Sequence, residues 1–279
     1  MRWVIATILA AQFAAAEPSC PTCAARSERI DIEIAPNGWG GAELSDIHVL
    51  LVSVASQFPL GAIGIAPPPI YVFYSTLGNP IILAERTKHN KVQIALGAGA
   101  RYWAQYSFQF SHEFVHVLVR HMDAAQGADA PSTPATWLEE SLAEVGSLFA
   151  LRAMAREWKT QAPYPNWTSY SEELTRYSQE IIEQAETKLS AQESFLQWFE
   201  SQQSHLQGNA HDRPANSLIA VQMLPLFEQS PETWATLLYF SRADTTSSDS
   251  SKVMFAKWAA ACPDDLRPHV ERLAALFEG

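Results

Sequence analysis

Two histidines and a glutamate near the middle of the chain have the spacing of a site that binds a metal and activates water. His112, Glu113 and His116 form a His-Glu-x-x-His pattern inside a run with helical apolar spacing. Residues four apart lie on one face of a helix, so both imidazoles can reach one ion. Glu113 lies about 100° round the helix from His112, where it can accept a proton from water without binding the ion. The pattern predicts a Zn2+ site in which Glu113 is the general base.

A catalytic zinc ion needs a third protein ligand and one open position. A glycine at position 119 followed by a histidine or aspartate at position 122 would complete one known ligand pattern, but Val119 and Met122 occupy these positions. A second helix is expected from Trp137 onward, and there Glu140 and Glu144 share one face. We therefore predict that Glu140 is the third ligand and that Glu144 accepts a proton from a ligating imidazole.

The neighbouring acid, Glu139, competes with Glu140 for the role of ligand. Thr136 precedes Glu139 by three residues, which is the pattern of a capping box and predicts that the Glu139 side chain is used at the start of the helix. This favours Glu140 as the ligand. Loss of zinc from Glu139→Ala but not from Glu140→Ala would reverse the assignment. An alternative interpretation is that these acids form a solvated helix face.

At these residues the chain resembles the gluzincin-type zinc metallopeptidases, which combine a His-Glu-x-x-His helix with a glutamate on a following helix. Residues 137–143, Trp-Leu-Glu-Glu-Ser-Leu-Ala, are similar to the Trp-Leu-Asn-Glu-Gly-Phe-Ala segment of the aminopeptidase-like members. The match places the ligand on Glu140 and departs at Glu139 and Ser141. The likeness covers about residues 30 to 150. The Gly-x-Met-Glu-Asn motif of the aminopeptidases is missing before His112, which argues against aminopeptidase activity.

The resemblance also implies a tyrosine or histidine, well downstream of the third ligand, that stabilises the oxyanion. His211 precedes an expected helix and is the candidate, with Asp212 or another acid to orient it. His205 and Tyr170 are alternatives, and an ordinary surface histidine is at least as compatible with the sequence.

The elements expected around these residues favour an α+β, zincin-like fold, in which a small mixed sheet packs on the active-site helix and a mostly helical half follows. Strands are expected at Ile30–Ile34, Ile70–Tyr74 and Lys91–Leu96, and the last could be an edge strand that pairs with an extended substrate. The expected helices span Ala42–Phe58, Tyr102–Met122, Trp137–Met154, Ser171–Lys188, Gln192–His205, Ala215–Gln229, Glu232–Phe240, Lys252–Ala261 and Asp264–Phe277.

The N-terminus predicts export. Arg2, the apolar run Trp3–Phe13 and the small residues Ala14–Ala16 are typical of a cleavable signal peptide. We expect cleavage after Ala16 and a secreted or periplasmic protein, with a zincin-like part over residues 17–155 and a helical part over residues 156–279. No later segment is long and apolar enough to predict a membrane span.

Charge and cysteine content narrow the partners. The chain has 19 Lys and Arg against 30 Asp and Glu, a formal net charge of −11, which argues against a nucleic-acid partner. In an oxidising compartment two of Cys20, Cys23 and Cys262 are expected to form a disulfide, and the sequence leaves open which two.

Together these features predict a zinc-dependent hydrolase that cleaves peptides or proteins. Glu113 would take the proton of a metal-activated water and pass it to the leaving amine. The alternatives are a catalytically inactive, peptidase-like zinc-binding protein and a purely structural helical domain in which the histidines are core residues.

Overall fold

The computed structural model describes residues 30–61, 63–64, 66–120, 136–191 and 193–278. The predicted signal peptide, Cys20 and Cys23 lie outside these residues, so the export and disulfide predictions are not tested by the structure. Cys262, the one cysteine within the described residues, is buried. In the described part of the chain, no helix has the length and apolar character that a membrane crossing requires.

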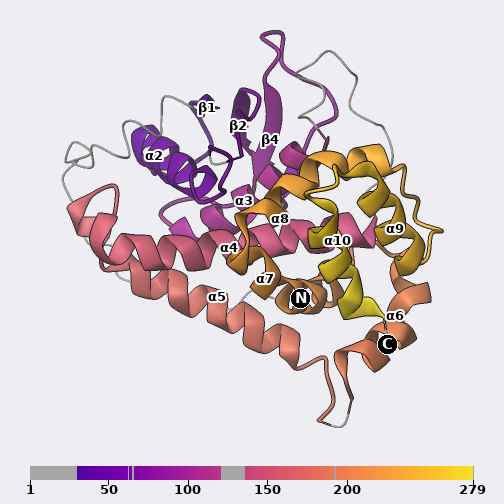
Figure 1. Cartoon of the computed structure of the whole chain (residues 1–279). Coiled ribbons are helices and arrows are strands. Elements are labelled where there is room, and N and C mark those ends of the chain that lie inside the picture. The colour runs from indigo at the N-terminus through magenta and orange to yellow at the C-terminus, as the bar shows by residue number, and fades with distance from the viewer. Residues whose placement is uncertain (1–29, 62, 65, 121–135, 192, 279) are drawn as a thin grey trace.

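A four-stranded mixed sheet forms the upper layer in Figure 1. Its strands lie in the order β1 (Ile32–Ile34), β2 (Ile70–Tyr74), β4 (Val92–Leu96) and β3 (Ile81–Ile82). The first three run parallel, and β3 runs antiparallel to β4. Buried apolar residues recur along β2 and β4, as expected for strands that are covered by helices. The α+β class with a small mixed sheet is confirmed.

The prediction that the strand at Lys91–Leu96 is a sheet edge is wrong. Ile81 and Ile82 of β3 pair with Ala95 and Ile94, and the N–H of Leu83 donates to the Gln93 carbonyl at 2.9 Å. The edge is β3, which has two residues and therefore too short an apolar alternation to predict from the sequence. β4 has its backbone groups engaged on both sides along much of its length.

Two long helices lie beneath the sheet and hold the candidate site. Helix α3 (Trp103–Arg120) carries the histidines, and α4 (Trp137–Gln161) carries the glutamates. Every residue from Trp137 to Leu151 is buried, because α4 packs against α3 on one side and against α5 (Tyr170–Glu186) and α7 (Arg213–Gln229) on the other. The interpretation of Glu139, Glu140 and Glu144 as a solvated helix face is therefore wrong.

The rest of the described chain is helical, as predicted. Two expected helices are interrupted: the segment from Pro231 forms α8 and then a 3-10 turn, η3, and the C-terminal segment forms α10 and then η5. The further elements are α2 (Leu44–Ala55), η2 (Pro165–Trp167), α6 (Phe195–Gly208), α8 (Pro231–Ala235), η3 (Thr236–Tyr239), η4 (Ser241–Ala243), α9 (Ser251–Ala261), α10 (Arg267–Ala274) and η5 (Ala275–Phe277).

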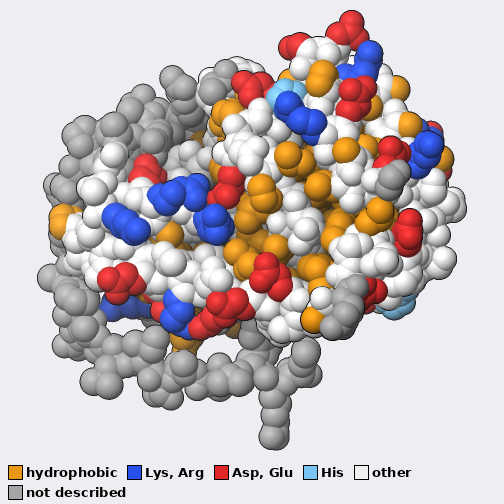
Figure 2. All heavy atoms as spheres, turned by 60° about the horizontal axis from the view of Figure 1, so that its bottom comes forward, with side chains coloured by type: hydrophobic (Ala, Val, Ile, Leu, Met, Phe, Trp, Pro, Cys, Tyr) orange, Lys and Arg blue, Asp and Glu red, His pale blue; other side chains and the backbone are white. Residues whose placement is uncertain are grey.

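Buried side chains from the sheet and from the helices on both halves of the chain join one apolar core. On the face of the molecule seen in Figure 2, apolar side chains gather in a patch that acidic and basic side chains border. The core packs around α4, so the polar groups of this helix must find partners inside the protein.

Candidate metal centre

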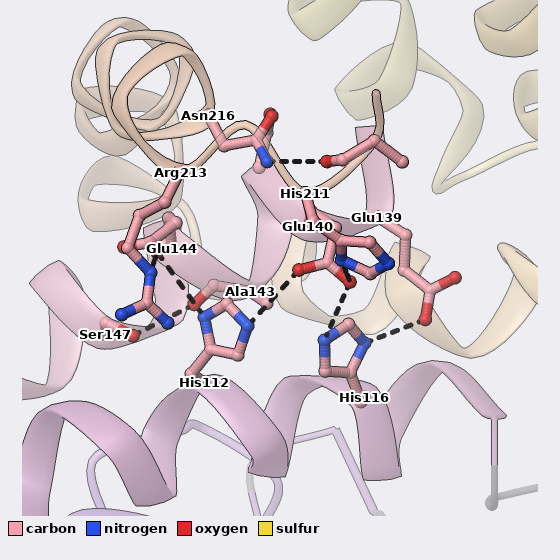
Figure 3. Close-up of polar contacts among 12 residues, drawn as sticks. His112, His116, Glu139, Glu140, Ala143, Glu144, Ser147, His211, Arg213 and Asn216 are labelled. Carbon is pink, nitrogen blue, oxygen red and sulfur yellow. Dashed lines mark hydrogen bonds and ion pairs between the residues drawn. The ribbon is translucent and has the colours of Figure 1, made fainter. Parts of the chain in front are cut away.

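The three predicted ligands converge in the interior. One ligand atom from each of His112, His116 and Glu140 lies within 4.8 Å of the others, and all three residues are buried. The Nε2 atom of His112 lies 3.5 Å from one oxygen of Glu140, and the Nε2 atom of His116 lies 3.5 Å from the other. The carboxylate thus faces both rings across the gap between α3 and α4 (Figure 3). This group could hold a metal ion.

The spacing of these atoms can be compared with the spacing of ligand atoms around a metal ion. Ligand atoms about 2.1 Å from a tetrahedral zinc ion lie about 3.4 Å from one another. Each imidazole nitrogen lies 3.5 Å from a different oxygen of Glu140, and one ligand atom from each of the three residues lies within 4.8 Å of the others. Nitrogen and oxygen donors in a buried cluster are compatible with several divalent ions, so the donor set alone does not distinguish zinc from its neighbours in the periodic table.

A glycine allows α4 to approach α3 at this point. A Cβ atom on Gly146 would lie 2.3 Å from Cγ2 of Val115, which is far inside van der Waals contact. One residue on, the Ser147 hydroxyl donates to the carbonyl of Phe108 at 3.0 Å and ties the two helices together. The small side chains of α4 at the crossing therefore bring Glu140 within reach of the histidines.

The His116 side of the centre is held by Glu139, whose side chain the sequence assigns to a capping box. Oε1 of Glu139 lies 2.8 Å from Nδ1 of His116, and the two oxygens of Glu139 accept bonds from Arg120 at 2.5 and 3.1 Å. Because an ionised carboxylate can only accept, Nδ1 of His116 is the donor, which leaves Nε2 to face Glu140. Thr136 does cap α4 by accepting from the backbone N–H of Glu139, but the Glu139 side chain does not complete the predicted capping box.

These contacts decide the charges on this side. Burial alone lowers the pKa of His116, but the bond to Glu139 and the surrounding carboxylate charges outweigh burial and raise this pKa to about 9. Burial raises the pKa of Glu140, yet the neighbouring imidazoles lower it to about 2. Burial also raises the pKa of Glu139, but its bonds to His116 and Arg120 have the larger effect. The net result is a lowered pKa. Glu140 is therefore ionised and available to a cation, whereas the oxygens of Glu139 are already engaged by His116 and Arg120.

The His112 side is less completely bonded. Oε1 of Glu144 lies 3.8 Å from Nδ1 of His112, so the two groups are neighbours without a hydrogen bond. Nδ1 of His112 and Oε2 of Glu144 are both buried and have no hydrogen-bond partner among the described residues. Burial raises the pKa of Glu144, and the nearby His112 and Arg213 only partly oppose this. The structure places Glu144 at the imidazole that it was predicted to orient, but not within bonding distance of it.

Glu113 lies beside the ligands without joining them. It is 4% exposed and forms no hydrogen bond or ion pair within the described part of the chain. Its charge is among those that raise the pKa values of His116 and Arg120, so it lies close enough to interact with both groups. A buried carboxylate that is near the cluster but outside the ligand set is where a general base is required.

The segment before α7 brings His211 to the centre. Nδ1 of His211 lies 3.4 Å from Oε1 of Glu140, and its side chain is 74% exposed. Asn216, which is 2% exposed, fixes this segment, because its Nδ2 donates to the Ala210 carbonyl at 2.7 Å and its Oδ1 accepts from Ser141 at 3.3 Å. Figure 3 shows His211 and Arg213 entering from the side opposite the histidine helix.

The alternatives to His211 are engaged elsewhere. Tyr170 accepts the backbone N–H of Ala104, at the start of α3 and two turns before His112. His205 lies 2.8 Å from Asp212, whose other oxygen caps α7 by accepting from the N–H of Ala215. Asp212 therefore pairs with His205 and not with His211, and the acid next to His211 is Glu140.

Sequence reasoning missed two arginines and misassigned Glu139. Arg120 lies one helical turn beyond His116, so a bond between a carboxylate and both residues could have been anticipated. Arg213 carries no comparable signal, because its contact with Glu144 depends on how α7 packs on α4.

In comparisons with known proteins, no protein-family model, no curated protein and no solved structure matches this chain.

Proposed function

We propose that the protein is a zinc-dependent peptidase that uses His112, His116 and Glu140 as ligands and Glu113 as general base. The observation that carries the proposal is the buried convergence of two imidazoles and one carboxylate on a single point. Three protein ligands leave one coordination position open, which is the arrangement of catalytic rather than structural zinc. The resemblance to the gluzincins supports peptide bonds as the substrate.

A divalent ion held by these ligands would lower the pKa of water and polarise the carbonyl of the peptide bond. Glu113 takes one proton from the attacking water as its oxygen bonds to the carbonyl carbon. Glu113 then delivers this proton to the amine nitrogen as the carbon–nitrogen bond breaks. His211, which lies beside Glu140 and is largely exposed, would donate to the developing oxyanion.

Zinc analysis and hydrolysis of a peptide library test the proposal together. The purified chain should bind about one zinc ion per molecule, since its described residues offer one such set of ligands. Glu113→Gln should keep the zinc and lose nearly all hydrolysis, because the amide cannot take the proton. A matched control is Glu173→Gln, a partly exposed glutamate paired with Arg176 on α5, which should change neither quantity.

Two outcomes would overturn the proposal in different ways. A parent protein that binds zinc but cleaves no peptide is an inactive zinc-binding protein. A Glu113→Gln variant that cleaves as fast as the parent would show that this carboxylate is not the base.

A further inference from the structure

The exposed side of the metal centre carries hydrogen-bond donors and one fixed cation, Arg213, although the protein is acidic overall at −11. Of the described residues that form ion pairs with the carboxylates of the centre, those with the most exposed side chains are His211, at 74%, and Arg213, at 48%. The glutamates are all 9% exposed or less: Glu113, Glu139, Glu140 and Glu144. A ligand that approaches from solvent therefore meets imidazole and guanidinium donors before it meets a carboxylate.

Arg213 is held in place but has donors left over. Its Nε lies 3.2 Å from Oε1 of Glu144, and its guanidinium carbon lies 5.8 Å from the centre of the Phe108 ring. Within the described residues it forms no other ion pair or hydrogen bond. The terminal Nη1 and Nη2 groups are thus uncommitted. A guanidinium fixed at one edge presents the other as a planar fork, which matches a carboxylate.

Two buried polar atoms near Arg213 also lack a hydrogen-bond partner. Nδ1 of His112 and Oε2 of Glu144 are buried without a hydrogen bond among the described residues. Such groups are uncommon in folded proteins, so the interior beside Arg213 is incompletely bonded. The backbone on either side of Arg213 is fixed, because Asn216 holds the carbonyl of Ala210 and Asp212 caps α7. Little order would have to be gained on binding.

The reach from Arg213 to the metal ligands sets where a bound carboxylate would lie. Arg213 contacts Glu144, and Glu140 lies one helical turn away, which is about 5.4 Å along α4. An extended peptide advances about 3.4 Å per residue. A carboxylate held by Arg213 would therefore lie within one or two residues of the bond being cleaved.

We propose that Arg213 is a specificity residue that binds a carboxylate of the substrate. The substrate class is then peptides with a carboxylate within one or two residues of the cleaved bond. This carboxylate belongs either to a free C-terminus or to an acidic side chain. The inference rests on the proposed peptidase function, and it adds a substrate class that the metal centre alone does not define.

Binding to a non-hydrolysing protein tests the subsite apart from catalysis. Zinc-loaded Glu113→Gln protein is titrated, by fluorescence anisotropy, into fluorescein-labelled Ala-Ala-Leu-Ala-Ala with a free C-terminus, into the same peptide amidated, and into amidated versions with Glu or Gln at the fourth position. The free acid, the Glu peptide or both should bind about 10- to 100-fold tighter than the matched neutral peptide, as expected of charge-assisted hydrogen bonds. Whichever arm shows the preference identifies the source of the carboxylate.

Two further variants, each made on the Glu113→Gln background, separate recognition from folding. Arg213→Gln should abolish the preference, and Arg213→Lys should retain part of it, because lysine keeps the charge and loses the fork. Arg152→Gln is the matched control: Arg152 pairs with Glu228 between α4 and α7 but has no contact with the centre. It should leave the preference unchanged. Zinc content and thermal unfolding of each variant show that the fold is intact.

Absence of any preference in the Glu113→Gln protein, or a preference that survives Arg213→Gln, would overturn the inference. Hydrolysis of the same peptides by the parent protein distinguishes this failure from failure of the proposed function. Cleavage of acidic and neutral peptides with equal kcat/KM would leave the peptidase and remove the subsite. A binding preference without cleavage would leave the subsite and remove the peptidase.

Discussion

The two imidazoles of the centre sit in contrasting environments. On the His116 side, Glu139 bonds the ring at 2.8 Å and is itself clamped by Arg120. On the His112 side, the ring nitrogen and one oxygen of Glu144 have no hydrogen-bond partner among the described residues. One histidine is thus fixed by the fold before a metal arrives, and the other has room to adjust. Under the proposed function, His116 would be the more rigid ligand of a bound ion, and the His112 side would face the substrate subsite proposed at Arg213.

The largest effect is expected where the bonded side is broken. Glu139→Ala leaves Arg120 without its partner and His116 without its acceptor. We expect a loss of about 3 kcal/mol of unfolding free energy, at the lower end for a broken buried ion pair because Arg120 is 22% exposed. Zinc affinity should fall about 10- to 100-fold. Thermal or urea unfolding and competition with a chelating dye measure the two quantities.

Two companion variants separate stability from metal binding. Arg120→Ala combined with Glu139→Ala should regain part of the stability, because no unpaired charge remains, but not the zinc affinity. Glu228→Ala is the control. The Glu228 carboxylate accepts two hydrogen bonds from Arg152, as Glu139 does from Arg120, but it is not part of the centre. This variant should leave zinc affinity unchanged. Zinc binding by Glu139→Ala as tight as that of the parent would show that the network does not position His116.

A smaller loss is expected when both sides are displaced together. Gly146→Ala places a Cβ atom 2.3 Å from Cγ2 of Val115 and should push α4 from α3. Overpacking of this kind costs about 1–3 kcal/mol. Glu139, Glu140 and Glu144 all move with α4. The difference between the environments of the two histidines should therefore become smaller, and zinc affinity should fall.

Rescue by Val115→Ala tests the cause. The double variant Val115→Ala with Gly146→Ala should be more stable than the sum of the single changes, by about 1 kcal/mol in a double-mutant cycle. Gly208→Ala, at the end of α6 with open space around it, should be neutral or slightly stabilising. If the two changes are simply additive, the Gly146–Val115 contact does not set the helix separation.

Local patterns in the sequence were sufficient to predict which three residues converge, and tertiary packing decided the rest. The spacing of His112 and His116 on one helix face needs no tertiary information, and β2 was predicted with the bounds that it has. The capping pattern correctly predicted the role of Thr136 but not the direction of the Glu139 side chain. A bond to an imidazole on another helix replaced the local one, because Glu139 is buried beside His116 and cannot be left without a partner.

The smallest effect is expected on the unbonded side. Glu144→Gln keeps the shape of a side chain whose Oε2 has no hydrogen bond in the described structure and whose Oε1 lies 3.8 Å from His112. It removes the ion pair with the half-exposed Arg213, and it also removes the cost of burying a charge. These opposing changes should leave the unfolding free energy within about 1 kcal/mol of the parent, with a loss of zinc affinity smaller than that of Glu139→Ala.

Unfolding and dye-competition measurements on Glu144→Gln and Glu139→Gln, which make the same change on the two sides, provide the direct comparison. Equal losses of zinc affinity in the two variants would mean that His112 and His116 are held equally once the metal is bound, and that the contrast belongs to the metal-free protein alone.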